Sequence, residues 1–169
     1  IAVDAAVKHT ALYSGADLSA PVVITGAGTG QPVAEHLVIT VGAHSRATIV
    51  VRYVGSAEFA DKTDLVVAEG ASVTFVSIQD WADDAVHGGQ HAVLVGRDAQ
   101  VRTVTVSLGG DLVRLAETAR FAGPGGELEQ FGLYFVDAGQ HIEHRLFVDH
   151  NAPHTRSHVD YRGALQGQG

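Results

Sequence analysis

Histidines gather near the end of the chain, in the stretch "GQHIEHRLFVDHNAPHTRSHVDYRG". This stretch holds half of the chain's 10 histidines, namely His141, His144, His150, His154 and His158. Imidazole is a common ligand of zinc and iron, and on a helix His154 and His158 would share one face. A metal site, with His150 and His154 as its candidate ligands, is therefore one hypothesis for this stretch.

The local sequence favours structural roles for these histidines instead. Pro153 has no backbone N–H and biases Ala152 away from the α region, so "NAP" is typical of a corner that separates His150 from His154. His141 and His144 are three residues apart and would face opposite sides of a strand. We therefore expect the histidines to pack or to cap turns, and we expect no metal site.

Carboxylates form a second set of residues that could do chemistry. Some parallel β-helical enzymes hydrolyse sugars with two acids on one exposed face, and Glu127 and Glu129 would share a strand face. The other close pairs are Asp83 with Asp84 and Glu143 with Asp149. On a protein of net charge −8, a solvated acidic surface is the simpler interpretation.

Composition limits the class of protein. The chain has 169 residues, which predicts a single domain over residues 1–169. Scattered arginines and a net charge of −8 argue against nucleic-acid binding, and no apolar run reaches the roughly 18 residues of a membrane span. With no cysteine, the chain can form no disulfide or thiolate metal site. It begins with Ile1 and contains no methionine, so we expect a piece of a longer protein, truncated at both ends.

A pattern of about 27 residues recurs along the chain. Each copy has an apolar residue, three mostly polar or glycine positions, a small residue and then a β-rich run. The copies begin at Val41, Val67, Val95, Phe121 and Val148, and their small residues are Ser45, Ala71, Ala99, Gly125 and Ala152. Between the copies lie alternating or β-branched segments such as "HLVITV" and "VRTVTVSL". A small residue at a tight corner and two strands per repeat predict a parallel coil, in which each turn contacts only its neighbours.

Two features need interpretation within this coil. The segment 111–121 has helical spacing of its apolar residues, but its place in the repeat predicts a strand. Glycines at the predicted edges of the turns are interpreted as turn residues: Gly88, Gly89, Gly109, Gly110 and Gly139.

Three stretches carry a resemblance to a known family. They are "VVAEGASVTFVSIQDW" (66–81), "FGLYFVDAGQHIEHRL" (131–146) and "VDHNAPHTRSHVDYRGAL" (148–165). They resemble the SufB/SufD family of iron–sulfur cluster assembly proteins, over most of the chain from about Val22 to Gly163. The resemblance implies a right-handed parallel β-helix, here of about five to six turns, and a scaffold that acts with the SufC ATPase.

Within the family, the chain is most like SufD. SufB carries cysteines in this region, including one in an early turn, whereas the stretch 50–59 here has none. "QDW" is similar to a Gln-x-Trp element that lines the SufB interior, so the resemblance makes Gln79 and Trp81 candidate interior residues. The helical region that binds SufC lies outside this chain, as do the later turns that pair SufB with SufD.

The sequence therefore predicts a non-enzymatic, cytoplasmic scaffold subunit in iron–sulfur cluster assembly. We expect no bound cofactor in this chain, because the cluster is assembled transiently by the full complex. The partners implied are SufB-like and SufC-like subunits, and we expect this piece to pair end to end as a homodimer through its open last turn. The alternatives are a β-helical carbohydrate-active enzyme and, less favoured, a histidine-rich metal-binding β-protein such as a cupin.

Overall fold

The computed structural model describes residues 5–137 and 139–167. Strands make up nearly all of the regular structure of this part. Their bounds are β1 (Ala5–Leu12), β2 (Val22–Thr29), β3 (Val33–Val41), β4 (Arg46–Ser56), β5 (Glu58–Val67), β6 (Ser72–Trp81), β7 (Val86–Val95), β8 (Gln100–Leu108), β9 (Leu112–Phe121), β10 (Glu127–Val136), β11 (His141–Asp149) and β12 (Arg156–Leu165). No helix in the described ranges is long and apolar enough to cross a membrane.

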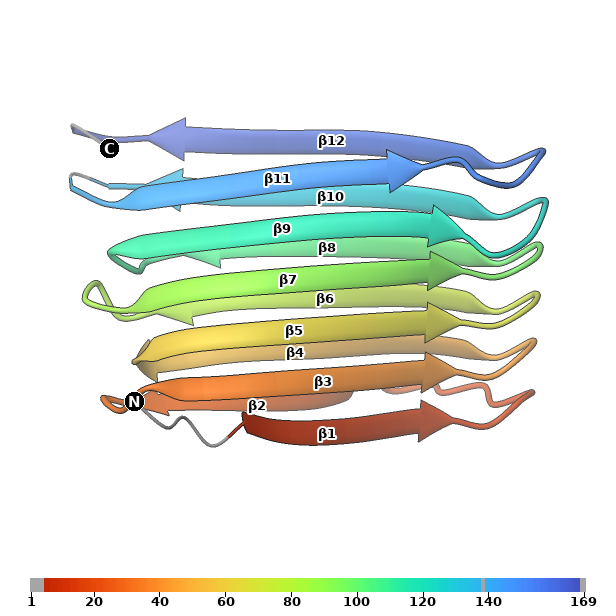
Figure 1. Cartoon of the computed structure of the whole chain (residues 1–169), viewed down its shortest axis with the longest axis horizontal. Coiled ribbons are helices and arrows are strands. Elements are labelled where there is room, and N and C mark those ends of the chain that lie inside the picture. Colours follow the sequence, from red (N-terminus) through yellow and green to blue (C-terminus); the bar gives the residue numbers. More distant parts are fainter. Residues whose placement is uncertain (1–4, 138, 168–169) are drawn as a thin grey trace.

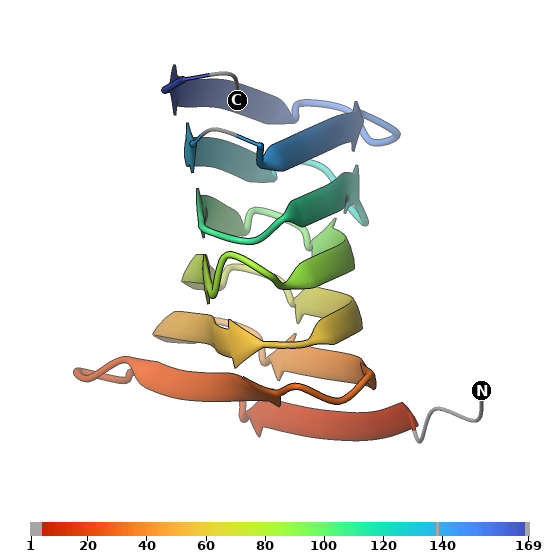
Figure 2. The same cartoon turned by 90° about the vertical axis from the view of Figure 1, so that its left-hand side faces the viewer.

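The strands form two parallel sheets that lie face to face (Figures 1 and 2). Sheet A has the order β1-β3-β5-β7-β9-β11, and sheet B has the order β12-β10-β8-β6-β4-β2. One strand of each sheet makes up one rung of the coil. In Figure 1 the nearer strands of sheet A run to the right and the fainter strands of sheet B run to the left as the chain climbs, so the coil is right-handed. The structure confirms the predicted parallel β-helix.

Alternation along each strand separates the core from the surface. Successive side chains of a strand point to opposite sides of its sheet, and in β6 every second residue, from Val73 through Phe75 to Trp81, is buried. The buried apolar residues from β3 to β10 form one continuous cluster between the sheets, and partly buried residues of the first and last rungs pack against it. Because every rung adds the same two inward faces, the core is a column along the coil axis.

The corners that lead from sheet A to sheet B each hold one residue with positive φ. In every corner but the last, the amide of this residue donates to a carbonyl of the neighbouring rung; His44 N–H, for example, donates to the Glu69 carbonyl at 2.9 Å. The left-handed conformation suits glycine, and an Asn, Asp or His is the usual substitute. The positions are Gly15, His44, Gly70, Asp98, Gly125 and His154.

The predicted column of small residues is correct for its first three members only. Ser45, Ala71 and Ala99 stack, since the amide that follows each corner donates to the carbonyl one rung below, as Gln100 does to Ala71 at 2.8 Å. In the next rung Arg156 donates to Gly126 at 3.0 Å, so Gly126 takes the place predicted for Gly125. Ala152 is displaced in the same way, because these corners lengthen from residues 68–71 to 122–126 and then 150–155.

Of three other sequence-based expectations, the structure confirms one and contradicts two. Segment 111–121 is a strand, as predicted: in β9 Val113, Leu115 and Phe121 point inward with period two. Gly88 and Gly89 were expected in a turn, and this was wrong, since both lie within β7. The cupin alternative is also wrong, because a cupin is an antiparallel jelly roll, whereas all strand pairs of the described chain are parallel.

Candidate functional site

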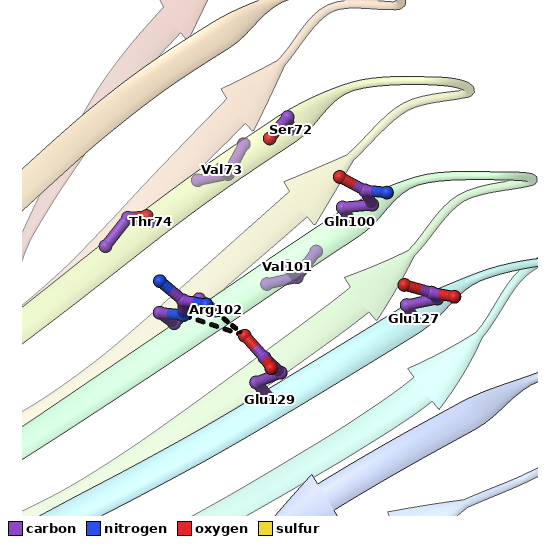
Figure 3. Close-up of a pocket in the computed structure, with 8 residues that line it drawn as sticks. All are labelled: Ser72, Val73, Thr74, Gln100, Val101, Arg102, Glu127 and Glu129. Atoms are coloured by element: carbon purple, nitrogen blue, oxygen red, sulfur yellow. Dashed lines mark hydrogen bonds and ion pairs between the residues drawn. The ribbon is translucent and has the colours of Figure 1, made fainter.

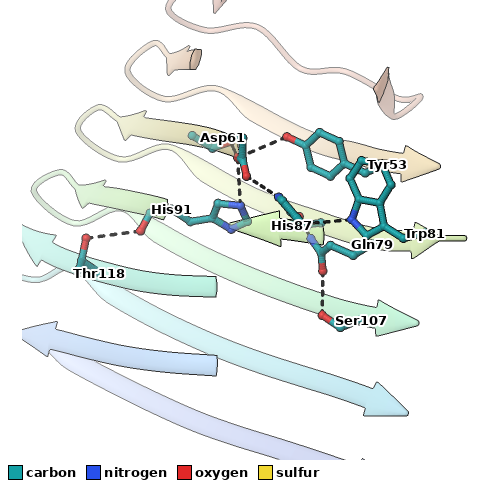
Figure 4. Close-up of polar contacts among 10 residues, drawn as sticks. Tyr53, Asp61, Gln79, Trp81, His87, His91, Ser107 and Thr118 are labelled. Carbon is teal, nitrogen blue, oxygen red and sulfur yellow. Dashed lines mark hydrogen bonds and ion pairs between the residues drawn. The ribbon is translucent and has the colours of Figure 1, made fainter. Parts of the chain in front are cut away.

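Polar side chains fill the middle of the coil (Figure 4). They occupy inward positions of both sheets, in phase with the buried apolar residues of the same strands. The buried members from β5 to β10 are Asp61, Thr63, Ser77, Gln79, His87, His91, Thr103, Thr105, Ser107, Glu117 and Gln130. Burying a polar group costs free energy unless it finds a partner, so this interior network is the candidate site.

Asp61 is the centre of the network. Its Oδ1 lies 2.7 Å from Nε2 of His87, and its Oδ2 accepts from the Thr63 hydroxyl at 3.1 Å and from the Tyr53 hydroxyl at 3.5 Å. Burial opposes ionisation of the carboxyl, but the N–H groups of His87 and His91 outweigh burial and hold the pKa of Asp61 well below its usual value. Asp61 is therefore a buried carboxylate.

Hydrogen bonds determine the tautomer of His87. The Trp81 indole nitrogen, which can only donate, lies 3.1 Å from Nδ1 of His87. Nδ1 must therefore accept, and the imidazole proton sits on Nε2, where it faces Asp61. Both ring nitrogens are occupied, so His87 has no free lone pair with which to take a proton from a substrate.

His91 supplies the positive charge of the interior. Its Nε2 lies 3.5 Å from Oδ2 of Asp61, an electrostatic contact rather than a full hydrogen bond. Burial alone would lower the pKa of His91, but the charges of Asp61 and Glu117 raise it above the usual value. The ring also packs edge-on against Phe75, with ring centroids 6.3 Å apart. The coil thus buries an Asp–His ion pair.

Gln79 and Trp81, the two residues taken from the family resemblance, lie inside the coil. Gln79 is 0% exposed and Trp81 is 4% exposed. The Gln79 amide donates to Ser77 Oγ at 2.7 Å, and its carbonyl accepts from Ser107 Oγ at 3.0 Å. The Trp81 ring stacks on Tyr53 with ring centroids 5.7 Å apart. Hydrogen bonds therefore fix the Gln79 side chain, and ring packing fixes the Trp81 side chain.

The network continues into the later rungs through His144. Nε2 of His144 lies 3.0 Å from Ser107 Oγ, and its Nδ1 lies 3.9 Å from Oε1 of Glu117. The Tyr161 hydroxyl donates to the same Glu117 oxygen at 3.0 Å. Burial, helped by the nearby charge of His91, lowers the pKa of His144 to about 4, so its ring is neutral at physiological pH.

Four buried polar atoms of the interior have no hydrogen bond to any described residue. They come from both sheets, and two of them belong to register partners on β8 and β10. The atoms are His91 Nε2, Thr103 Oγ1, Gln130 Oε1 and His144 Nδ1. Both ring nitrogens of His87 therefore have hydrogen-bond partners, whereas His91, beside Asp61, and His144, beside Glu117, each have one ring nitrogen without a partner in the described part of the chain.

The remaining histidines of the C-terminal cluster lie apart from one another. His150 contacts the Thr155 and Ser157 hydroxyls at 2.7 and 2.8 Å and stacks on Phe121. His154 is the exposed, positive-φ residue of the same corner. His141 points outward while His144 points inward, as the strand pattern predicts. No group of three or more His, Asp or Glu residues suited to a metal ion occurs in the described ranges, so His150 and His154 gain no further ligand there.

The acidic pairs lie on the outside of the coil. Glu127 and Glu129 share the outer face of sheet B, as predicted, beside a hollow of about 330 Å³ (Figure 3). The Glu129 carboxylate is bound by Arg102 at 2.5 Å. Glu143 pairs with Arg114 at 3.3 Å. Asp83 and Asp84 accept hydrogen bonds from Gln140 and Ser56. Since Glu129 is neutralised by an arginine, it is poorly placed to act as a sugar-cleaving acid.

Sequence reasoning missed the centre of the site. Asp61, His87, His91 and Glu117 were not singled out, although their signal was present in the strands. Each stands in phase with buried apolar residues of its own strand, as His91 does with Val93. A polar residue at the apolar phase of a predicted strand is the pattern that would have found them.

The fold and this interior define a parallel β-helical protein with a polar, histidine-containing axis. Comparison with known proteins then identifies its family. Residues 22–169 match the family described as SUF system FeS cluster assembly, SufBD core domain. The chain therefore belongs to the SufBD family of iron–sulfur cluster assembly, and the resemblance noted in the sequence is confirmed.

Curated relatives come from mycobacteria. The chain is 47% identical over 146 residues to an iron–sulfur cluster assembly SufBD family protein of Mycobacterium leprae, and 46% identical over 146 residues to one of Mycobacterium bovis. Each match covers 86% of this chain but only 37% of the relative, so the chain spans little more than a third of their length. No solved structure matches it significantly.

Proposed function

We propose that this chain is the β-helical core of a SufD-like, non-enzymatic scaffold subunit in iron–sulfur cluster assembly. Membership of the SufBD family supports a role in iron–sulfur cluster assembly. The chemistry of the interior supports a SufD-like rather than a SufB-like subunit. SufB-type sulfur transfer needs a thiolate, and the chain has no cysteine at any position. Histidine, aspartate and tryptophan side chains occupy the interior instead.

The Asp61–His87 pair has no ring nitrogen free to act as a general base, which supports a structural role for this pair. An Asp–His pair is part of many hydrolytic sites, where the second ring nitrogen accepts the proton of the nucleophile. In this coil Trp81 occupies Nδ1 of His87, 3.1 Å away. The pair therefore joins two strands and a tryptophan, and this is the observation that carries the proposal of a scaffold.

The proposal includes partners and location. A SufB-like subunit supplies the cysteines, a SufC-like ATPase supplies the energy of ATP hydrolysis, and the complex works in the cytoplasm. The iron–sulfur cluster is the cargo of this complex and not a resident cofactor of the β-helix.

Co-expression tests the proposal. The protein in its longest native form is produced with the SufB-like and SufC-like proteins of the same organism, purified by a tag on this subunit, and analysed for bound partners, iron and sulfide. We expect all three subunits to co-purify. We also expect cluster formation that is lost when the cysteines of the SufB-like subunit are replaced.

Two results would contradict the proposal. One is failure to retain either partner. The other is a stoichiometric, stable cluster on this subunit by itself, because its β-helix offers no thiolate. Replacing Arg97, an exposed corner residue, with lysine in the same subunit is the control and should leave partner binding unchanged.

A further inference from the structure

The outer face of sheet B carries a continuous apolar surface that the proposed function does not use. On β8 three successive outward residues are apolar, and the three outward residues beside them on β10 are larger still. Strand register places Val104 beside Phe131, Val106 beside Leu133 and Leu108 beside Phe135. β4 and β6 extend the surface. We define the sheet B patch as Val50, Val76, Ile78, Val104, Val106, Leu108, Phe131, Leu133 and Phe135.

The widest part of the patch is open to solvent. Leu133 is 52% exposed, Phe135 is 40% exposed and Leu108 is 37% exposed. Isolated apolar residues are normal on a protein surface, but a contiguous group that spans several strands marks an interaction site. The outer face of sheet A differs, because charged residues interrupt its aliphatic ones: in one row Val66 and Leu94 are followed by Arg120 and Asp149.

Charge around the patch is balanced, although the whole protein has a net charge of −8. Neighbouring strands pair opposite charges at the rim: Arg102 binds Glu129 and lies over the Phe131 ring, and Arg52 binds Asp80. The outward charged residues of β4 to β12 on this sheet are five arginines and four carboxylates, namely Arg46, Arg52, Arg102, Arg156, Arg162, Asp80, Glu127, Glu129 and Asp160. A second copy of the same face therefore meets no like-charged field.

We propose that the sheet B patch is a self-association surface, through which two copies of this chain pack face to face about a two-fold axis. Two such faces, pressed together like the sheets of a β-sandwich, would lie about 10 Å apart. The patch spans four strands by about five residues, which covers roughly 300 Å² per copy at the usual strand spacing and rise. That is below the usual size of a stable specific interface, so the dimer is weak, transient and reversible.

Salt dependence follows from the same geometry. The net charge of −8 repels two copies at long range, while the contact itself is apolar. Added salt screens the repulsion and leaves the apolar contact intact, so association should strengthen with ionic strength. An interface held by ion pairs would weaken instead.

Sedimentation velocity over a wide concentration range tests the surface, with three variants that each place one lysine at an exposed apolar position. Leu133→Lys lies in the sheet B patch, Phe147→Lys lies on the outer face of sheet A, and Val159→Lys lies on the last described rung. All three positions are exposed, at 52%, 60% and 46%, so the variants should fold, which circular dichroism checks. Lysine also lowers the net negative charge, so loss of association cannot come from added repulsion between whole molecules.

We expect the parent protein and the Phe147→Lys and Val159→Lys variants to show a concentration-dependent dimer, which Leu133→Lys weakens at least tenfold. A parent protein that stays monomeric at every concentration and salt overturns the proposal. So does a dimer that Val159→Lys disrupts and Leu133→Lys leaves intact, because association would then run through the last rung.

Discussion

The Trp81 indole nitrogen lies 3.1 Å from Nδ1 of His87, and Nε2 of the same ring lies 2.7 Å from Oδ1 of Asp61. These contacts join β6, β7 and β5 through one imidazole. Because tryptophan can only donate, the contacts make His87 a neutral ring with its proton on Nε2.

The tautomer of His87 is directly measurable. A long-range ¹H–¹⁵N correlation spectrum at neutral pH should contain one histidine with the Nε2–H pattern that is absent from the spectrum of His87→Leu. A doubly protonated pattern for this ring would mean that Trp81 does not donate to it.

Removing the His87 ring should destabilise the coil strongly. His87→Leu leaves the Asp61 carboxylate with fewer donors and the Trp81 N–H without an acceptor, which we expect to cost about 3 kcal/mol in urea unfolding. The matched control is His36→Leu, which breaks the half-exposed contact of His36 with Asp64 and should cost less than about 1 kcal/mol. Equal losses for the two variants would contradict the importance of the buried pair.

Two adjacent glycines of β7 should respond differently to alanine. A Cβ on Gly89 would lie 2.6 Å from both Oδ1 of Asp61 and Cδ2 of Leu115, whereas a Cβ on Gly88 has no atom within 4 Å. We expect Gly89→Ala to lose about 2 kcal/mol in thermal or urea unfolding. Gly88→Ala should be neutral or slightly stabilising, because alanine restricts the unfolded chain. A Gly89→Ala variant of unchanged stability would show that the side chains around Gly89 can move to accommodate a methyl group.

Acid should destabilise the protein through His144. Its pKa in the folded state is about 4, below the ordinary value of about 6.5 for the unfolded chain. The unfolded state therefore binds the proton first, and stability falls as the pH drops from about 6.5 to 4, by on the order of 3 kcal/mol. In His144→Gln this part of the pH dependence should disappear from urea titrations, and an unchanged profile would place the titration on another group.

The ion pair of Asp61 and His91 acts at the two ends of the pH range. The pKa of Asp61 is depressed. Its carboxylate therefore adds to the free energy of unfolding above about pH 4, and this stabilisation is lost as the pH falls further. The pKa of His91 is raised. Its stabilisation of the folded state is therefore complete below about pH 6.5 and is lost as the pH rises through the pKa of His91 in the folded protein. Asp61→Asn should remove the acid dependence and reduce the alkaline one, because Glu117 still raises the pKa of His91. An alkaline loss of unchanged size in that variant would separate His91 from Asp61.

Trp81 reports on the interior, since it is the only tryptophan of the chain. With 4% of its surface exposed, its fluorescence should be blue-shifted and poorly quenched by acrylamide. His87→Leu should shift the emission by removing the acceptor of the indole N–H. Ready quenching in the parent protein would place Trp81 at the surface.

The sequence by itself determined the architecture. Small residues at Ser45, Ala71 and Ala99 recur at corner spacing, and in a parallel coil each rung repeats the geometry of the one before, so local periodicity predicts the global fold. The same reasoning placed His141 and His144 on opposite sides of β11, because the two-residue period of a strand needs no tertiary information.

Only the tertiary structure decided which residues meet. Asp61, His87 and Trp81 lie on three strands, and in the sequence nothing marks them as partners. Stacking in sheet A places His87 one rung above Asp61 and next to the inward face of β6, where Trp81 completes the contact. The two corners between β5 and β7, of four residues each, set this register, and a single extra residue at a corner would move a side chain to the other face of its sheet. Periodicity therefore predicts the rungs, whereas the contacts inside them depend on a register that only the packed coil fixes.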